Sequence, residues 1–113
     1  MKQLTVIVNE ALEEVKGENI ITLDVTDITA VMDTVIVVSG STSRQVKALS
    51  NAVIEASKKA GFQPLGVEGM DGGEWVLVDL IDVVVHIMQP AVRDFYELEK
   101  LWSVRPNDTV VGN

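Results

Sequence analysis

Residues 72–90 of the chain, GGEWVLVDLIDVVVHIMQP, contain two apolar runs that are interrupted by only a few polar residues. Residues 75–80 and 83–88 are rich in valine and other apolar residues that favour β-strands. So short a gap between them predicts a tight turn, and Pro90 is typical of the first residue of a helix. We expect that helix to continue to about Trp102. The stretch thus predicts two neighbouring strands followed by a helix.

Helix and strand patterns alternate along the rest of the chain. Apolar residues recur at helical spacing over about residues 2–16 and over residues 42–61, which begin with TSRQ, the spacing of a capping box. Residues 19–25 alternate between apolar and polar, and residues 34–39 form a β-branched run typical of a buried strand. The glycine-rich residues 62–74 leave room for one short strand and a loop. This order predicts an α/β fold (α+β, with a mixed sheet) of about five strands and three helices.

The length of 113 residues suits one domain, which can bury roughly 65% of the surface of its unfolded chain. With 47% hydrophobic and 4% aromatic residues, the core is expected to consist mainly of aliphatic side chains. Periodicity ends near residue 102. We therefore expect residues 1–102 to form the domain and residues 103–113 to form a flexible C-terminal tail.

The charge balance indicates the kind of partner. Seventeen acidic residues against nine basic ones leave a net charge of -8, which repels the phosphates of nucleic acids. The GVEG sequence at residues 66–69 fits the glycine loop of KH domains, but it would present Glu68 to phosphate, so a flexible turn is the better interpretation. We expect little direct nucleic-acid binding and a basic protein as partner.

The sequence contains no cysteine, so it offers no disulfide, zinc thiolate or catalytic thiol. Its first apolar run is broken by Glu10, Glu13 and Glu14, unlike a signal peptide. No apolar stretch reaches the length that crosses a membrane. We expect a soluble cytoplasmic protein.

Four residues are candidates for chemistry: Ser41, Asp79, Asp82 and His86. Ser41 follows Gly40 in a strand, turn and helix start that resembles a phosphate-binding loop, but the lysine and second glycine of a P-loop are missing. An ordinary helix cap explains these residues.

Asp79 and Asp82 are three positions apart, so they share no face of an extended strand. They flank the predicted turn, where aspartate commonly accepts hydrogen bonds from local backbone. His86 has the strand parity of Val84 and Met88, which favours a half-buried histidine with a hydrogen-bond partner over a metal ligand. We expect no enzyme activity, cofactor or metal. The alternative is a residual nucleotidyltransferase-like enzyme, dependent on nucleotide or metal.

Several large side chains are better suited to binding a protein. Trp75 follows a glycine-rich loop, where an indole ring is often only partly covered. Leu80 and Ile81 at the turn would add exposed apolar area, and Tyr96 and Lys100 point away from the apolar face of the last helix. Exposed Trp, Tyr and Leu side chains near one sheet edge are typical of a binding hot spot.

Three long stretches carry a resemblance to a known family. They are DVTDITAVMDTVIVVSGSTSRQVKALSNAV at residues 24–53, GVEGMDGGEWVLVDLIDVVVHIMQP at residues 66–90 and RDFYELEKLW at residues 93–102. In these stretches the sequence resembles the ribosomal silencing factors, or Iojap-like family. The resemblance implies a small mixed α/β domain of nucleotidyltransferase-like architecture without the catalytic carboxylates.

The resemblance also implies a function. Such proteins bind the large ribosomal subunit at ribosomal protein L-fourteen, block joining of the small subunit, and so repress translation under nutrient limitation. They are expected to form homodimers when free. The implied contact residues are Trp75, Leu80, Tyr96 and Lys100.

Position 81 departs from the family pattern, which usually has glycine between the residues corresponding to Leu80 and Asp82. Glycine there allows a positive φ in a tight turn, a conformation that is costly for a β-branched residue. Either the turn differs in this chain, or Ile81 adds apolar contact area beside Leu80.

Overall fold

The computed structural model describes residues 3–96, with side chains described through Asp94. The mixed α/β class, with five strands and three helices, is confirmed. The strands are β1 (Glu18–Asp24), β2 (Thr34–Ser39), β3 (Gly66–Glu68), β4 (Trp75–Asp79) and β5 (Val83–Met88), and the helices are α1 (Leu4–Glu14), α2 (Ser43–Lys59) and α3 (Pro90–Tyr96).

The five strands form one sheet in the order β1-β2-β5-β4-β3. The central pair, β2 and β5, is parallel, with Thr34 opposite Val83, whereas the other neighbouring pairs are antiparallel. Strands β2 and β5 are buried along almost their whole length. This explains why their sequences are continuously apolar rather than alternating.

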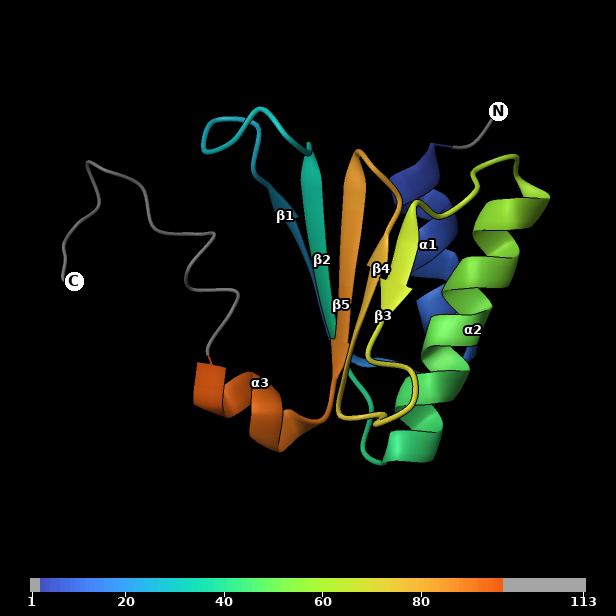
Figure 1. Cartoon of the computed structure of the whole chain (residues 1–113), viewed down its shortest axis with the longest axis vertical. Helices are drawn as coiled ribbons and strands as arrows, with labels where there is room; N and C mark the ends of the chain where they lie inside the picture. Colours follow the sequence, from blue (N-terminus) through green and yellow to red (C-terminus); the bar gives the residue numbers. More distant parts are fainter. Residues whose placement is uncertain (1–2, 97–113) are drawn as a thin grey trace, which may run out of the picture.

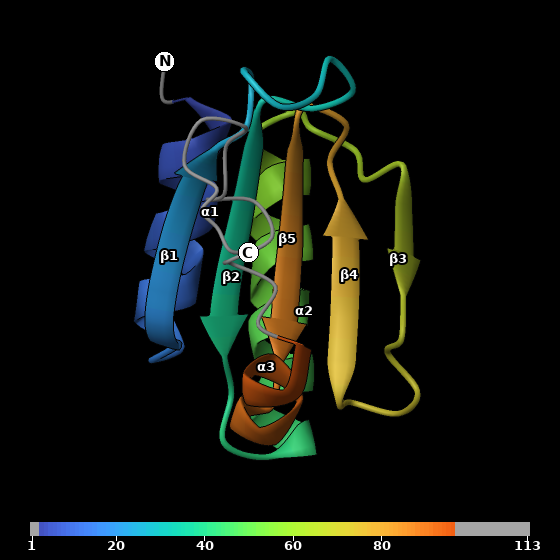
Figure 2. The same ribbon diagram turned by 90° about the vertical axis from the view of Figure 1, so that its left-hand side faces the viewer.

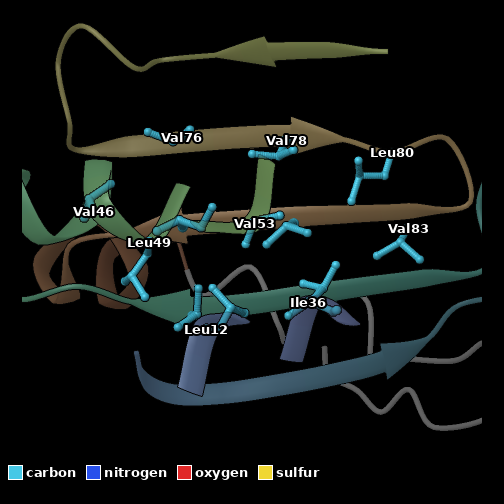
Figure 3. Close-up of a cluster of buried hydrophobic side chains, with 13 residues drawn as sticks. Leu12, Ile36, Val46, Leu49, Val53, Val76, Val78, Leu80 and Val83 are labelled. Carbon is cyan, nitrogen blue, oxygen red and sulfur yellow. The ribbon is translucent and has the colours of Figure 1, made fainter. Parts of the chain in front are cut away.

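Helices α1 and α2 cover one face of the sheet (Figure 1). The main core lies between these helices and the sheet, as Figure 3 shows. Leu12 of α1 and Leu49 and Val53 of α2 pack there against Ile36 of β2 and Val78 of β4. The helical spacing of the apolar residues in α2 is what turns one side of that helix towards the sheet.

The opposite face of the sheet carries a second, smaller apolar cluster. Val35, Val37 and Met88 are buried there, and Trp75 and Val92 pack against them. Of the described helices only α3 lies on this side, across the ends of β2 and β5 (Figure 2). The described residues therefore leave much of this face, which we call the open face, without a covering layer.

Helix α3 is fastened to the sheet through Arg93. The Nη1 group of Arg93, which is buried, donates a hydrogen bond of 2.9 Å to the Oγ of Ser39 at the end of β2. A hydrogen bond from a buried guanidinium is among the stronger ones in a protein. This bond sets where α3 crosses the open face.

The start of α2 confirms half of the predicted capping box. The Oγ1 of Thr42 accepts a hydrogen bond of 3.1 Å from the backbone N–H of Gln45. The Gln45 side chain, however, donates from its Nε2 to the carbonyl oxygens of Val15 at 2.9 Å and Lys16 at 3.2 Å. It thus ties the start of α2 to the end of α1.

The structure differs from one prediction at residues 66–69 and describes only the first part of the last helix. Residues 66–68 form the edge strand β3, with Val67 opposite Val78, so the interpretation of GVEG as a turn was wrong. The helix expected from Pro90 begins there, but its predicted end at Trp102 and the predicted tail fall on residues 97–113, outside the described residues.

Candidate partner-binding site

Trp75 begins β4 and lies on the open face. Strand pairing places it opposite Met88 of β5, and its ring packs against the smaller apolar cluster. The ring is half-buried, as the sequence predicted. Its Nε1–H donates a hydrogen bond of 3.1 Å to the Nδ1 of His86, and the two ring centroids are 6.0 Å apart with a tilt of 46°.

His86 lies in the middle of β5 with only 8% of its surface exposed. It is opposite Leu77 of β4 and Val37 of β2, so apolar residues flank it on both neighbouring strands. Burial lowers the pKa of His86 below its ordinary value of 6.5. A neutral imidazole accepts at one nitrogen and donates at the other, so acceptance at Nδ1 places the proton on Nε2. The expected hydrogen-bond partner is confirmed, although the ring is buried rather than half-buried.

A shallow pocket of about 300 Å³ opens beside the indole ring. Trp75 and Leu77 of β4 form its apolar part, and Glu68 and Gly69 at the end of β3 form the rest. An aromatic ring next to an exposed carboxylate suits a partner that has both apolar and basic groups.

Leu80 corrects one expectation, because the structure leaves only 4% of its surface exposed. Its side chain belongs to the main core together with Val78 and Val83, as Figure 3 shows. The strand alternation that turns Val76 and Val78 towards the helices continues through Leu80. The prediction that Leu80 adds exposed apolar area was therefore wrong.

Ile81 occupies the middle of a strained turn. Its φ is 78°, and the N–H of Asp82 donates to the carbonyl oxygen of Leu80 at 3.0 Å, which closes a three-residue turn. The N–H of Ile81 donates to the Oδ1 of Asp79 at 2.8 Å, which confirms that Asp79 stabilises the turn. The Ile81 side chain is 54% exposed. The turn therefore needs a positive φ despite the isoleucine, and Ile81 does add apolar surface.

The residues of the alternative enzyme do not form one site. Asp79 is level with Val84, at the end of the sheet where β2 and β5 begin, whereas Ser41 follows the far end of β2. Val35 of β2 is level with Val84, and the four steps from Val35 to Ser39 span roughly 13 Å of extended chain. Within residues 3–96 no three His, Asp or Glu side chains are arranged to hold a metal ion.

Two predicted contact residues lie beyond what the structure describes. Tyr96 ends α3 but its side chain is not described, and Lys100 falls outside the described residues. Trp75 and Ile81 lie towards opposite ends of β4, so they mark a long strip rather than a point. Sequence reasoning missed Glu68 at the pocket and the bond between His86 and Trp75, because both depend on strand register.

The comparisons with known proteins identify the family. A model of the family described as "Ribosomal silencing factor during starvation" matches residues 1–112. Ribosomal silencing factor RsfS of Chromobacterium violaceum is 46% identical over 112 residues, which cover 99% of this chain and 92% of the relative. A more distant relative, mouse "Mitochondrial assembly of ribosomal large subunit protein 1", is 35% identical over 79 residues, or 67% of this chain and 35% of its own.

A solved structure supports the same assignment. The crystal structure of a Chromobacterium violaceum protein has a TM-score of 0.88 and 48% identity, and covers 96% of this chain and 91% of its own. Fold and site define a small mixed α/β domain with one sheet face that the described residues leave largely uncovered. The chain belongs to the ribosomal silencing factor family, whose members are ribosome-associated regulators that repress translation in starvation. Among residues 3–96, no helix is both long enough and apolar enough to cross a membrane.

Proposed function

We propose that this protein binds the large ribosomal subunit at ribosomal protein L-fourteen and blocks joining of the small subunit. Family membership supports a ribosomal target, and the mouse relative is named for the large subunit. The observation that carries the proposal is the half-buried Trp75 ring beside a pocket with a carboxylate, on a face that the described residues leave largely uncovered. Such aromatic anchors dominate the energy of protein interfaces.

In this proposal the predicted contact residues have different roles. Trp75 and Ile81 contact the partner directly because both present apolar surface. Leu80 supports the turn from inside the core and so holds Ile81 in place. Tyr96 and Lys100 extend the contact beyond β4. The net charge of -8 favours a basic ribosomal protein over rRNA as the contact.

The proposed mechanism is steric occupation without turnover, cofactor or metal. The protein acts in the cytoplasm with the ribosomes, and it forms a homodimer when it is free. Bound to the large subunit, it occupies space that the small subunit needs. Ribosomes whose subunits are already joined have that face covered, so they are expected to escape inhibition.

Light scattering of separated subunits tests the proposal. We expect the protein to inhibit their association at one copy per large subunit, without added nucleotide, and to leave joined ribosomes intact. Two results would contradict it. One is full inhibition by far less than one copy per subunit, and the other is loss of inhibition after metal is chelated from the protein stock before mixing.

A further inference from the structure

The hydrogen bond between Trp75 and His86 joins two neighbouring strands across the open face. Trp75 pairs with Met88 and His86 pairs with Leu77, so the two rings are diagonal neighbours on β4 and β5. Strand pairing fixes the backbone positions of the two residues. The 3.1 Å hydrogen bond from Nε1 to Nδ1 fixes the orientation of the indole ring. A ring that packs by apolar contact alone can change its tilt at little cost, whereas a hydrogen bond is directional.

The two rings differ in how accessible they are. Trp75 lines the open pocket, but His86 is 8% exposed. A partner can therefore reach the indole without displacing the imidazole. His86 acts behind Trp75, on the orientation of the ring that a partner meets.

We propose that His86 is a positioning residue whose neutral imidazole holds the Trp75 indole in its binding orientation, and that protonation of His86 releases the indole and weakens partner binding. The inference rests on the proposed role of Trp75 as a contact residue. A protonated imidazole has a proton on both nitrogens, so Nδ1 no longer accepts the indole N–H.

The charges around His86 determine the direction of the pH effect. On the same face, Glu68 lies beyond Leu77 and Asp79 lies two positions along β4. Strand β2 presents apolar residues and Ser39, and β1 presents apolar residues with Glu18 opposite Ser39 at its start. Helix α3 adds two charged residues near Ser39, namely Arg93, which is bonded to Ser39, and Asp94. Burial lowers the pKa of His86, and nearby carboxylates would raise it. The pKa is lowered, so the effect of burial is the larger one. The bond is therefore complete above about pH 6.5, the ordinary value, and is lost as pH falls through the lower pKa of the folded protein.

Two substitutions of similar size isolate the acceptor. In His86→Asn, the Oδ1 atom is attached to Cγ as Nδ1 is, so an acceptor remains that does not titrate. In His86→Leu, a methyl group takes that place. Both variants lose the rest of the ring, so a difference between them reports on the hydrogen bond rather than on lost packing.

The first measurement is the indole Nε1–H signal of Trp75 in ¹H–¹⁵N NMR spectra of the free protein. The Trp75→Phe spectrum shows which indole signal belongs to Trp75 and which to Trp102. At pH 7.5 we expect wild type and His86→Asn to show a hydrogen-bonded, slowly exchanging signal, and His86→Leu to show a shifted, rapidly exchanging one. On acidification the wild-type signal moves towards that of His86→Leu, and the His86→Asn signal does not. Because this titration uses the wild type, it tests the role of His86 protonation even if His86→Leu fails to fold.

The second measurement is cosedimentation with isolated large ribosomal subunits. At pH 7.5 we expect His86→Leu to bind roughly two- to tenfold more weakly than His86→Asn, the range that one net hydrogen bond gives. As pH falls through the lowered pKa of His86, the wild type loses affinity relative to His86→Asn. Identical indole signals in the Asn and Leu variants, or parallel loss of affinity in wild type and His86→Asn, would overturn the inference. If Trp75→Ala binds as tightly as wild type, the contact role fails instead, while the indole signals still decide whether His86 orients the ring.

Discussion

At position 81 the backbone adopts a conformation that glycine accepts easily and isoleucine does not. The φ of 78° in a three-residue turn places the Ile81 Cβ close to backbone atoms, a strain of roughly 1–3 kcal/mol. A strained backbone conformation persists where neighbouring groups stabilise it. Here the hydrogen bond from the N–H of Ile81 to Asp79 does so. Because the side chain is 54% exposed, packing within the described domain compensates for little of that strain.

Replacing Ile81 separates stability from binding. We expect Ile81→Gly to raise the free energy of unfolding by about 1 kcal/mol, since relief of strain exceeds the entropy cost of glycine. The same change should weaken binding to large subunits, because apolar contact area is lost. Ile81→Ala is the matched control, which loses the contact but keeps a side chain at positive φ. Urea unfolding and cosedimentation measure the two effects, and a less stable Ile81→Gly would contradict the strained turn.

Trp75 is expected to supply much of the binding energy. Trp75→Ala should weaken binding to large subunits by about 2 kcal/mol or more, roughly 30-fold, while the domain stays folded. Val6→Ala is a suitable control, since Val6 is 42% exposed on α1, behind the sheet. Cosedimentation and thermal unfolding test this pair. Unchanged binding by Trp75→Ala would remove Trp75 from the site, and loss of cooperative unfolding would show that the ring is mainly structural.

At this scale one prediction was wrong and one contact was not predicted, for different reasons. Leu80 lies on the same face as Val76 and Val78, two residues beyond Val78. Its burial could therefore have been predicted by extending the alternation of the strand by two residues. The His86 bond to Trp75 could not, because eleven positions separate them and only the pairing register brings the rings together.

Among the elements, the loop between β3 and β4 determines how Trp75 enters the sheet. Gly69 in this loop has a φ of 88°, and a Cβ there would overlap the carbonyl oxygen of Trp75. The loop also contacts the end of β5, since the Nε2 of Gln89 donates to the carbonyl oxygen of Gly73 at 3.1 Å. The close approach of Gly69 to the backbone of Trp75 thus helps to position the indole.

Substitution of Gly69 tests this close approach. Gly69→Ala should lower the free energy of unfolding by about 2 kcal/mol or more, because it combines an unfavourable φ with a backbone overlap. Gly66→Ala is the matched control, three residues earlier, where a Cβ meets no atom within 4 Å. We expect that variant to be within about 0.5 kcal/mol of wild type. Equal stability of the two variants in urea would show that the loop adapts.

Sequence patterns predicted the elements to different degrees. Strands β2 and β5 were predicted to the residue, because in both a β-branched run has polar residues at or next to its ends. Strand β3 was expected only as one short strand somewhere in residues 62–74, since it has only three residues and all are exposed. The strand order was not predicted either, because it depends on which strands pair across long stretches of chain.

For the whole molecule, the net charge of -8 predicts how binding responds to salt. Raising salt should slow association with large subunits more than it speeds release, since screening weakens attraction at a distance more than apolar contacts. Binding through phosphates would instead lose affinity steeply at equilibrium. Stopped-flow association and dissociation rates at several salt concentrations distinguish these cases. A release rate that rises as steeply as association falls would contradict an apolar anchor.

The parallel pairing of β2 with β5 also has a consequence for how the chain folds. Thr34 pairs with Val83, which is made 49 positions later. At roughly 5–20 residues per second, synthesis takes about 2–10 s to cover that interval. During this time β2, an apolar strand destined for the centre of the sheet, has no partner on its β5 side and can pair with other chains. This exposure of β2 ends only when β5 pairs with it. We therefore expect the folding rate to be governed by closure of the long loop between β2 and β5 rather than by formation of the helices.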